Sequence, residues 1–149
     1  MLEGAIIGII VAVIVMMIQK NKQKKALAEV NNSETLDTPS FSAFFHHATE
    51  KIFTGNGFKF FDGNGVGYLS GNNFNYKSKS GLQTFDLSIC TIEYAGKKKK
   101  LDWISIDDNG TKHYFTSFQQ GAFKMDGSEM NNFIEKLKEI SPESKLDIV

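Results

Sequence analysis

Residues 65–77, GVGYLSGNNFNYK, contain two short apolar runs and the turn between them. The runs at 66–70 and 73–77 are rich in aromatic and branched side chains, a composition typical of β-strands. Gly71 and Asn72 separate them, and these residue types adopt the positive φ angles of a two-residue hairpin turn. The stretch therefore predicts an antiparallel hairpin.

Five further strands are expected around this hairpin. They lie at residues 57–61, 84–87, 91–95, 101–106 and 111–117. The run at 101–106 is apolar on both faces, as a central strand would be. With seven strands, the chain is expected to form a mainly β (α+β) domain, built as a bent antiparallel sheet or a partly open barrel.

Two amphipathic helices are expected to flank the strands. One lies at the C-terminal end of the domain, with Ser128 as its cap, and covers one end of the sheet; its apolar stripe consists of Met130, Phe133, Ile134, Leu137 and Ile140. The other spans 39–52, with Thr38 as its cap and Pro39 in its first turn. The apolar positions of the second helix recur at spacings of three and four: Phe41, Phe44, Phe45, Ala48, Ile52 and Phe53. We expect this helix to lie on the domain rather than on a membrane surface, because its polar face carries few basic residues.

This order of elements resembles the bacterial pleckstrin-homology-like (PH-like) and GRAM-like domains. Residues 65–77 resemble the G-x-L-x-L-T-x-x-R-L-x-F hairpin of that family, and residues 85–94, FDLSICTIEY, resemble its I-P-L-x-x-I-x-x-V strand. Asn73 stands where the family often has Arg or Lys. The resemblance covers about residues 55–140. It implies a PH-like domain at 39–140 that binds lipid headgroups, peptides or proteins and has no shared catalytic centre.

The N-terminal segment has a different character. Residues 4–18, GAIIGIIVAVIVMMI, include no polar side chain, which is too apolar for one face of a soluble helix. With Leu2 and Glu3 the run is roughly 25 Å long, a little less than the ~30 Å hydrocarbon core of a bilayer. We expect residues 1–19 to be a single-pass transmembrane anchor.

The charges around this run distinguish an anchor from a cleaved signal peptide. Glu3 precedes the run and a lysine cluster follows it, the reverse of the order in signal peptides. The cluster consists of Lys20, Lys22, Lys24 and Lys25. By the positive-inside rule, the N-terminus faces outside the cell membrane and the domain is cytoplasmic. The alternative is a secreted protein released by cleavage after the lysine cluster.

Residues 20–38 form the expected juxtamembrane segment and linker. Its four lysines either contact anionic headgroups or serve only to fix the topology. Within the anchor, Gly4, Gly8 and Ala12 lie four residues apart, a spacing that lets two membrane helices pair and predicts a homodimer through the anchor. The alternative is that small residues are simply common in membrane helices. At the other end, residues 141–149 are expected to be a loose tail.

The strongest local charge in the domain is the run Lys97, Lys98, Lys99 and Lys100, in the turn before residue 101. A tethered domain has a high local concentration at the membrane, so weak lysine contacts with anionic lipid become effective. The alternative is a solvated turn that prevents pairing of sheet edges. Both interpretations stay open at the level of the sequence.

Composition argues against several other functions. The net charge is zero and the chain contains no arginine, which argues against nucleic-acid binding. One cysteine excludes a disulfide framework and a cysteine-based zinc site, and we expect no metal and no cofactor. No nucleophile motif is present. We therefore expect a non-catalytic, membrane-anchored adaptor or sensor that contacts a protein partner or an anionic lipid surface. The alternative is a small-ligand carrier or enzyme with its site inside the barrel.

Overall fold

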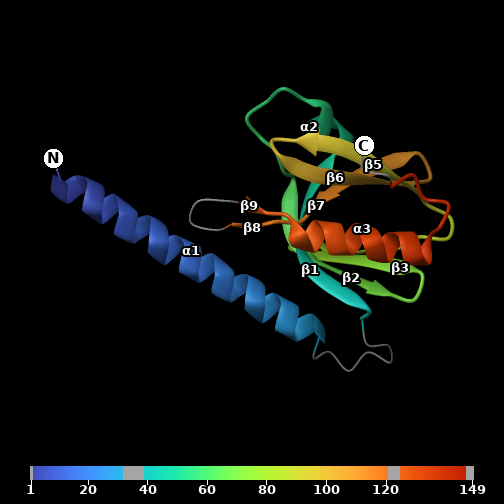
Figure 1. Cartoon of the computed structure of the whole chain (residues 1–149), viewed down its shortest axis with the longest axis horizontal. Coiled ribbons are helices and arrows are strands. Elements are labelled where there is room, and N and C mark those ends of the chain that lie inside the picture. The colour runs from blue at the N-terminus through green and yellow to red at the C-terminus, as the bar shows by residue number, and fades with distance from the viewer. Residues whose placement is uncertain (1, 32–38, 121–124, 147–149) are drawn as a thin grey trace.

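An antiparallel sheet of seven strands, covered by a C-terminal helix, forms the body of the protein in a computed structural model (Figure 1). The structure describes residues 2–31, 39–120 and 125–146; the side chains of residues 2–10, 31 and 120 lie outside the described part. The strands of the sheet are β1 (Phe41–Thr49), β2 (Gly63–Ser70), β3 (Asn73–Ser78), β4 (Gly81–Asp86), β5 (Thr91–Lys98), β6 (Leu101–Asp108) and β7 (Thr111–Thr116). The predicted mainly β class, with about seven strands and a C-terminal helix, is confirmed.

Two consecutive meanders build this sheet, in the spatial order β4-β3-β2-β1-β7-β6-β5. β1 joins them, because its first seven residues pair with β2 while its last four, His46 to Thr49, pair with β7. The hairpin predicted from residues 65–77 is β2–β3, with Leu69 opposite Phe74. The turn between β6 and β7 has Asn109 and Gly110 at positive φ, as a tight hairpin requires.

The predicted helix at 39–52 is wrong. Residues 41–49 form β1, and only the five-residue helix α2 (Glu50–Thr54) follows; Thr38, the predicted cap, lies outside the described residues. The apolar residues of this segment also satisfy a period of two. Phe45 points to one face of the sheet and Ala48 to the other, and both are fully buried. A strand with apolar side chains on both faces lacks a strict alternation, and its apolar positions can then also fall at helical spacing.

The predicted strand at 57–61 is also wrong, because no strand is assigned between α2 and β2. Gly55 and Gly57 interrupt the segment. Phe58, which follows them, is fully exposed. A strand needs partners for its backbone groups, and β1 already occupies the edge of β2 that this segment would need. The seventh strand of the sheet is therefore β1.

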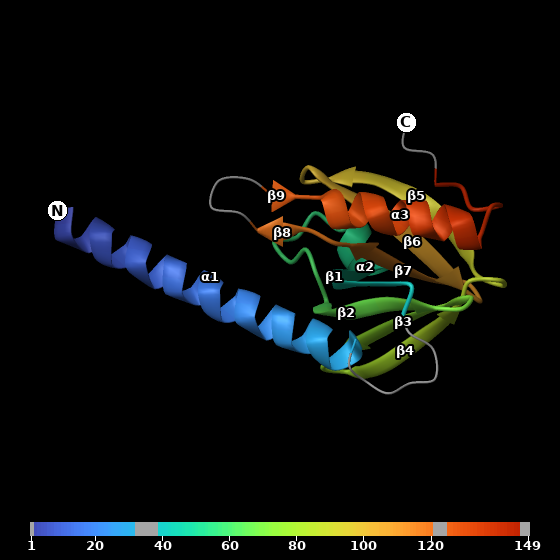
Figure 2. The same ribbon diagram turned by 60° about the horizontal axis from the view of Figure 1, so that its bottom comes forward.

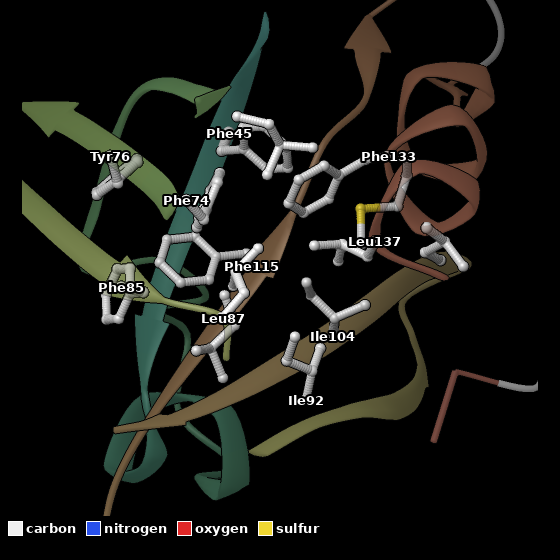
Figure 3. Close-up of a cluster of buried hydrophobic side chains, with 14 of the residues drawn as sticks. Phe45, Phe74, Tyr76, Phe85, Leu87, Ile92, Ile104, Phe115, Phe133 and Leu137 are labelled. Carbon is white, nitrogen blue, oxygen red and sulfur yellow. The ribbon is translucent and has the colours of Figure 1, made fainter. Parts of the chain in front are cut away.

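An aromatic core fills the space between the sheet and helix α3 (Ser128–Ile140). In Figure 3, Phe133 and Leu137 reach from α3 towards Phe45, Phe115 and Ile104. The Phe45 ring centroid lies 4.7 Å from that of Phe133, in an edge-to-face arrangement. These five side chains are fully buried. Each large side chain buried in this way contributes on the order of 2 kcal/mol.

A smaller cluster covers the opposite face of β1, β6 and β7. It joins Ala48, Leu101, Trp103 and Tyr114, and α2 closes it with Phe53. The rings of Phe53 and Tyr114 stack with centroids 4.0 Å apart. β6 therefore has apolar neighbours on both faces, and it lies between β5 and β7, as predicted for a central strand.

The C-terminal residues differ from the loose tail that we expected. Leu146 is fully buried in the core, and the Tyr94 amide donates a hydrogen bond to the Lys145 carbonyl at 2.8 Å. Residues 147–149 lie outside the described part. The segment thus continues α3 along β5 and covers part of that sheet edge. A separate two-stranded ribbon, β8 (Gln119–Gln120) with β9 (Met125–Asp126), precedes α3.

Helix α1 (Leu2–Asn31) contacts β1 and β2 near its C-terminal end, and its other end extends away from the domain (Figures 1 and 2). Val30 is buried, whereas Val11, Ile14 and Met17 are exposed. Within the described part of the chain, no helix is both long and apolar enough to cross a membrane. Residue 1 and the side chains of residues 2–10, half of the predicted anchor, lie outside that part.

Candidate functional site

The run Lys97 to Lys100 forms the tip of the β5–β6 hairpin, and its turn has an unusual backbone. Lys99 and Lys100 both lie in the left-handed region, with φ of 54° and 65°. An L-residue pays about 1–2 kcal/mol for that conformation. In the turn of the β6–β7 hairpin, the two residues with positive φ are Asn109 and Gly110, and Asn and Gly are the residue types that tolerate this conformation.

The four lysines have different surroundings. Lys98 is half-buried: its ammonium donates hydrogen bonds to the carbonyls of Phe53 and Gly55. Lys97, Lys99 and Lys100 are exposed, and the Lys97 ammonium lies 3.9 Å from an Asp102 carboxylate oxygen. The turn therefore presents three ammonium groups to solvent, while the fourth fixes the loop beside it.

That neighbouring loop, residues 55–62, is held at its other end by Asp62. The Asp62 carboxylate accepts hydrogen bonds from the Thr49 amide at 2.6 Å and the Thr49 hydroxyl at 2.7 Å. Although partial burial opposes the effect, these bonds lower the pKa of Asp62. The carboxylate stays ionised at neutral pH and serves as a structural clamp. The Lys59 ammonium forms a salt bridge with the same carboxylate, with its Nζ 3.3 Å from the Asp62 Oδ1.

Between these two attachments the loop exposes an aromatic side chain. Phe58 is 100% exposed, the largest value among the exposed apolar residues that the structure describes. The Lys99 ammonium lies 3.4 Å from the ring centroid of Phe60, which links the loop to the turn. We call residues 55–62 together with Lys97 to Lys100 the Phe58 edge. It combines an exposed phenyl ring with a cluster of ammonium groups, the two features that attach proteins to anionic bilayer surfaces.

The Phe58 edge lies on the side of the domain towards which α1 extends. In Figures 1 and 2, the loop after α2 and the β5–β6 turn face the same way as the N-terminal end of α1. The β4–β5 connection lies at the opposite end of β5, about 25 Å away at 3.3 Å per residue. The molecule therefore has one end with both the apolar helix and the Phe58 edge.

The other predicted lysines lie elsewhere. Lys20, Lys22 and Lys24 line a groove between α1 and the outer face of the sheet, which Lys77 and Lys79 also line. Lys25 is exposed on α1 and does not line the groove. The structure thus does not bring the two predicted lysine groups together. Gly4 and Gly8 belong to the part of α1 whose side chains lie outside the description, and Ala12 is exposed.

Two histidines, His47 and His113, form a polar pair within the sheet. The His47 Nε2 lies 3.1 Å from the His113 Nδ1, and both rings contact aromatic neighbours. Burial lowers the pKa of His47 to about 4 and lowers that of His113 as well. The pair is neutral at pH 7 and fits a structural role. Among the described residues, no three His, Cys, Asp or Glu side chains gather as a metal site would require.

Sequence reasoning missed two parts of the site. The aromatic residues at 57–61 predict a strand that includes Phe58, whereas the Gly55-Asn56-Gly57 stretch just before it indicates a loop. Lys77 and Lys79 read as ordinary hairpin residues, and no sequence signal places them opposite Lys20 and Lys24. Only the docking of α1 on β1 and β2 does so.

Comparison of the chain with protein-family models, curated proteins and solved structures gave no match. The geometry of the Phe58 edge and of α1 therefore carries the functional argument.

Proposed function

We propose that the protein is a non-catalytic, membrane-anchored binding module whose domain, PH-like in type, presents the Phe58 edge to an anionic lipid surface. The apolar N-terminal segment attaches the chain to the cell membrane, with the domain on the cytoplasmic side. The two successive meanders closed by a C-terminal helix support the PH-like assignment. Aromatic side chains fill the interior of the domain, which favours a module that binds through its surface and argues against a ligand or catalytic site inside the sheet.

The observation that carries the proposal is the lysine turn. Lys99 and Lys100 are held in a backbone conformation that costs about 1–2 kcal/mol each, whereas Asn and Gly would avoid most of that cost. Strained residues are typical of functional sites, where the side chain is needed for something other than stability. Beside them, Phe58 exposes its whole ring to solvent. The lysines and the exposed phenyl ring are thus both present at one edge although neither of them stabilises the fold.

Support for the membrane attachment comes from residues 4–18 and from the described part of α1. The run has no polar side chain, and the apolar side chains of Val11, Ile14 and Met17 have no cover from the domain. Insertion of this segment would place the Phe58 edge near the headgroups, because both face the same way (Figure 2). Each lysine near an anionic surface contributes about 1 kcal/mol of attraction.

Alkaline carbonate extraction tests the attachment. The full chain is expected to remain with the membrane pellet, and a variant with Ile9→Lys and Val13→Lys is expected to enter the supernatant, because two ammonium groups interrupt the apolar run. Release of the unaltered chain by carbonate would refute the attachment without bearing on the Phe58 edge.

An environment-sensitive NBD fluorophore tests the Phe58 edge. It is attached to the full chain in nanodiscs through Phe58→Cys, with Ile89→Cys as the matched control; Ile89 is 72% exposed and precedes β5. Native Cys90 is replaced by Ser in both variants, so that the label is confined to position 58 or 89; burial and the nearby Asp108, Asp86 and Asp107 raise the pKa of Cys90 to about 11, so the thiol is not needed as a charged group. We expect a blue shift at position 58 in anionic discs only, and none at position 89.

Charge reversal of Lys97, Lys99 and Lys100 to Glu is expected to abolish this shift. Lys98 is left in place because it fixes the loop. Equal emission at positions 58 and 89 would exclude lipid contact by the Phe58 edge and leave a protein partner as the target of the module. A shift at 58 that survives charge reversal would show that the ring enters the bilayer without the lysines, which would refute the proposed role of the lysine turn.

A further inference from the structure

An open groove lies between α1 and the outer face of β1, β2 and β3, and both apolar and basic side chains line it. Its volume is about 840 Å³, within the range of about 300–1,000 Å³ found for small-molecule sites. Its floor is apolar, formed by Phe44 and Val66 of the sheet together with Phe118, and α1 adds Leu27 and Val30. The aromatic core inside the sheet does not contribute to it.

Basic side chains surround this floor. Five lysines line the groove, from two parts of the chain: Lys20, Lys22, Lys24, Lys77 and Lys79. The two acidic residues that line it are Glu29 and Glu129, and Glu129 already accepts hydrogen bonds from Ser117 and Gln119. The groove therefore carries an excess of positive charge that selects for an anionic ligand.

His46 adds a neutral, aromatic wall. Its ring lies between those of Phe61 and Phe118, with centroid distances of 4.4 and 4.6 Å. Burial lowers the pKa of His46 to about 4, so the ring is uncharged at neutral pH. Its Nδ1 is buried and lacks a hydrogen-bond partner in the structure. The stacked rings give this side of the groove an uncharged, aromatic wall that suits a hydrocarbon chain.

We propose that this groove binds an amphiphile with a single acyl chain and an anionic head, a carboxylate or a phosphate. The chain lies on Phe44, Val66 and Phe118, and the head lies among the lysines. The groove begins on α1 at Met16 and Lys20, where the apolar run of the helix ends. This entry route rests on the proposed membrane attachment, since it would open the groove at the level of the headgroups. The site is separate from the Phe58 edge.

Photo-cross-linking to the full chain in zwitterionic nanodiscs tests the proposal. One arm uses palmitic acid with a diazirine on its chain, and the other uses a lysophosphatidylglycerol with the same group on its single chain, which distinguishes a free carboxylic acid from a phosphate-headed lipid. Labelled peptides are identified by mass spectrometry. Labelling of β1 and β2 by either probe is expected, and unlabelled palmitate should displace it whereas lysophosphatidylcholine should not.

Two variants define the site. Lys77→Glu with Lys79→Glu changes exposed residues and should reduce labelling of β1 and β2 about tenfold. Ala26→Trp fills the groove from α1 and should reduce labelling without a change of charge. The matched control Lys97→Glu with Lys99→Glu alters the Phe58 edge and should leave groove labelling unchanged.

Labelling confined to α1, or labelling of β1 and β2 that survives both groove variants, would overturn the proposal. Neither result would affect the Phe58 edge, whose own test uses a different label and different lysines. Conversely, if the NBD label at position 58 shows no blue shift while the groove is still labelled by the probes, the proposed lipid contact of the Phe58 edge would be refuted and the amphiphile site would stand.

Discussion

Replacing the lysine turn by the sequence of the neighbouring hairpin turn should make the domain more stable and bind membranes less well. The variant Lys99→Asn/Lys100→Gly copies Asn109-Gly110, where both residues also have positive φ angles. Relief of two left-handed lysines is worth about 2–4 kcal/mol at most. Against this, Gly costs about 0.5–1 kcal/mol of extra freedom in the unfolded chain, and the lost Lys99–Phe60 contact costs about 0.5–1 kcal/mol.

The net gain is about 1 kcal/mol in the free energy of unfolding, which corresponds to a rise of about 4 °C in Tm for a domain of roughly 110 residues. Thermal unfolding in neutral detergent micelles measures it through the fluorescence of Trp103, the single tryptophan. The reciprocal variant Gly110→Lys should lose about 1–2 kcal/mol. In anionic nanodiscs the stabilised variant should lose about 2 kcal/mol of lipid attraction.

The result that supports the reasoning is an increase in the unfolding free energy of the Asn-Gly variant together with a decrease in its attraction to anionic lipid. If the Asn-Gly variant unfolds at the same temperature as the original chain while Gly110→Lys is well tolerated, the turn is not strained. The argument that lysines are retained there for function would then fail.

Three further predictions concern the fold. The free energy of unfolding should fall as the pH drops from about 6.5 to 4. Burial lowers the pKa values of His46 and His47 to about 4 in the folded protein, so the unfolded chain takes up protons at a higher pH than the folded chain does. His46→Phe should reduce the pH dependence of the unfolding free energy by about one proton, as measured by denaturation at a series of pH values. Phe133→Ala should cost about 3–5 kcal/mol in urea unfolding, because its buried ring contacts Phe45 and Phe74, and a loss under 1 kcal/mol would contradict the packing of α3. Gly67→Ala should lower Tm, since a Cβ there would lie 2.5 Å from the Phe45 ring; an unchanged Tm would show that the sheet is looser than described.

Periodicity predicted most of the sheet because strands with one buried face and distinct turns have unambiguous patterns. The β2–β3 and β6–β7 hairpins follow directly from Gly71 and from Asn109-Gly110. It failed for β1 because both faces of that strand are buried. Phe44 and Phe45 then look like neighbours on a helical stripe, although they point to opposite sides of the sheet.

The candidate site was predicted only in part, for a related reason. The lysine run at 97–100 is visible in the sequence, but its strain and its contact with the loop at 55–62 depend on tertiary structure. Phe58 looked like a strand residue because aromatic side chains are common in strands. The groove was invisible because Lys20 and Lys77 approach only through the docking of α1, which no local pattern specifies.

The immersion depth of a spin label at position 58 tests the central claim most directly. The full chain carries Phe58→Cys or the control Ile89→Cys, and the relative accessibility of the label to oxygen and to a nickel chelate gives its depth in an anionic nanodisc. We predict that the label at 58 lies below the level of the lipid phosphates and that the label at 89 lies in water. A label at 58 that is as accessible to the chelate as the label at 89 would contradict the proposed function.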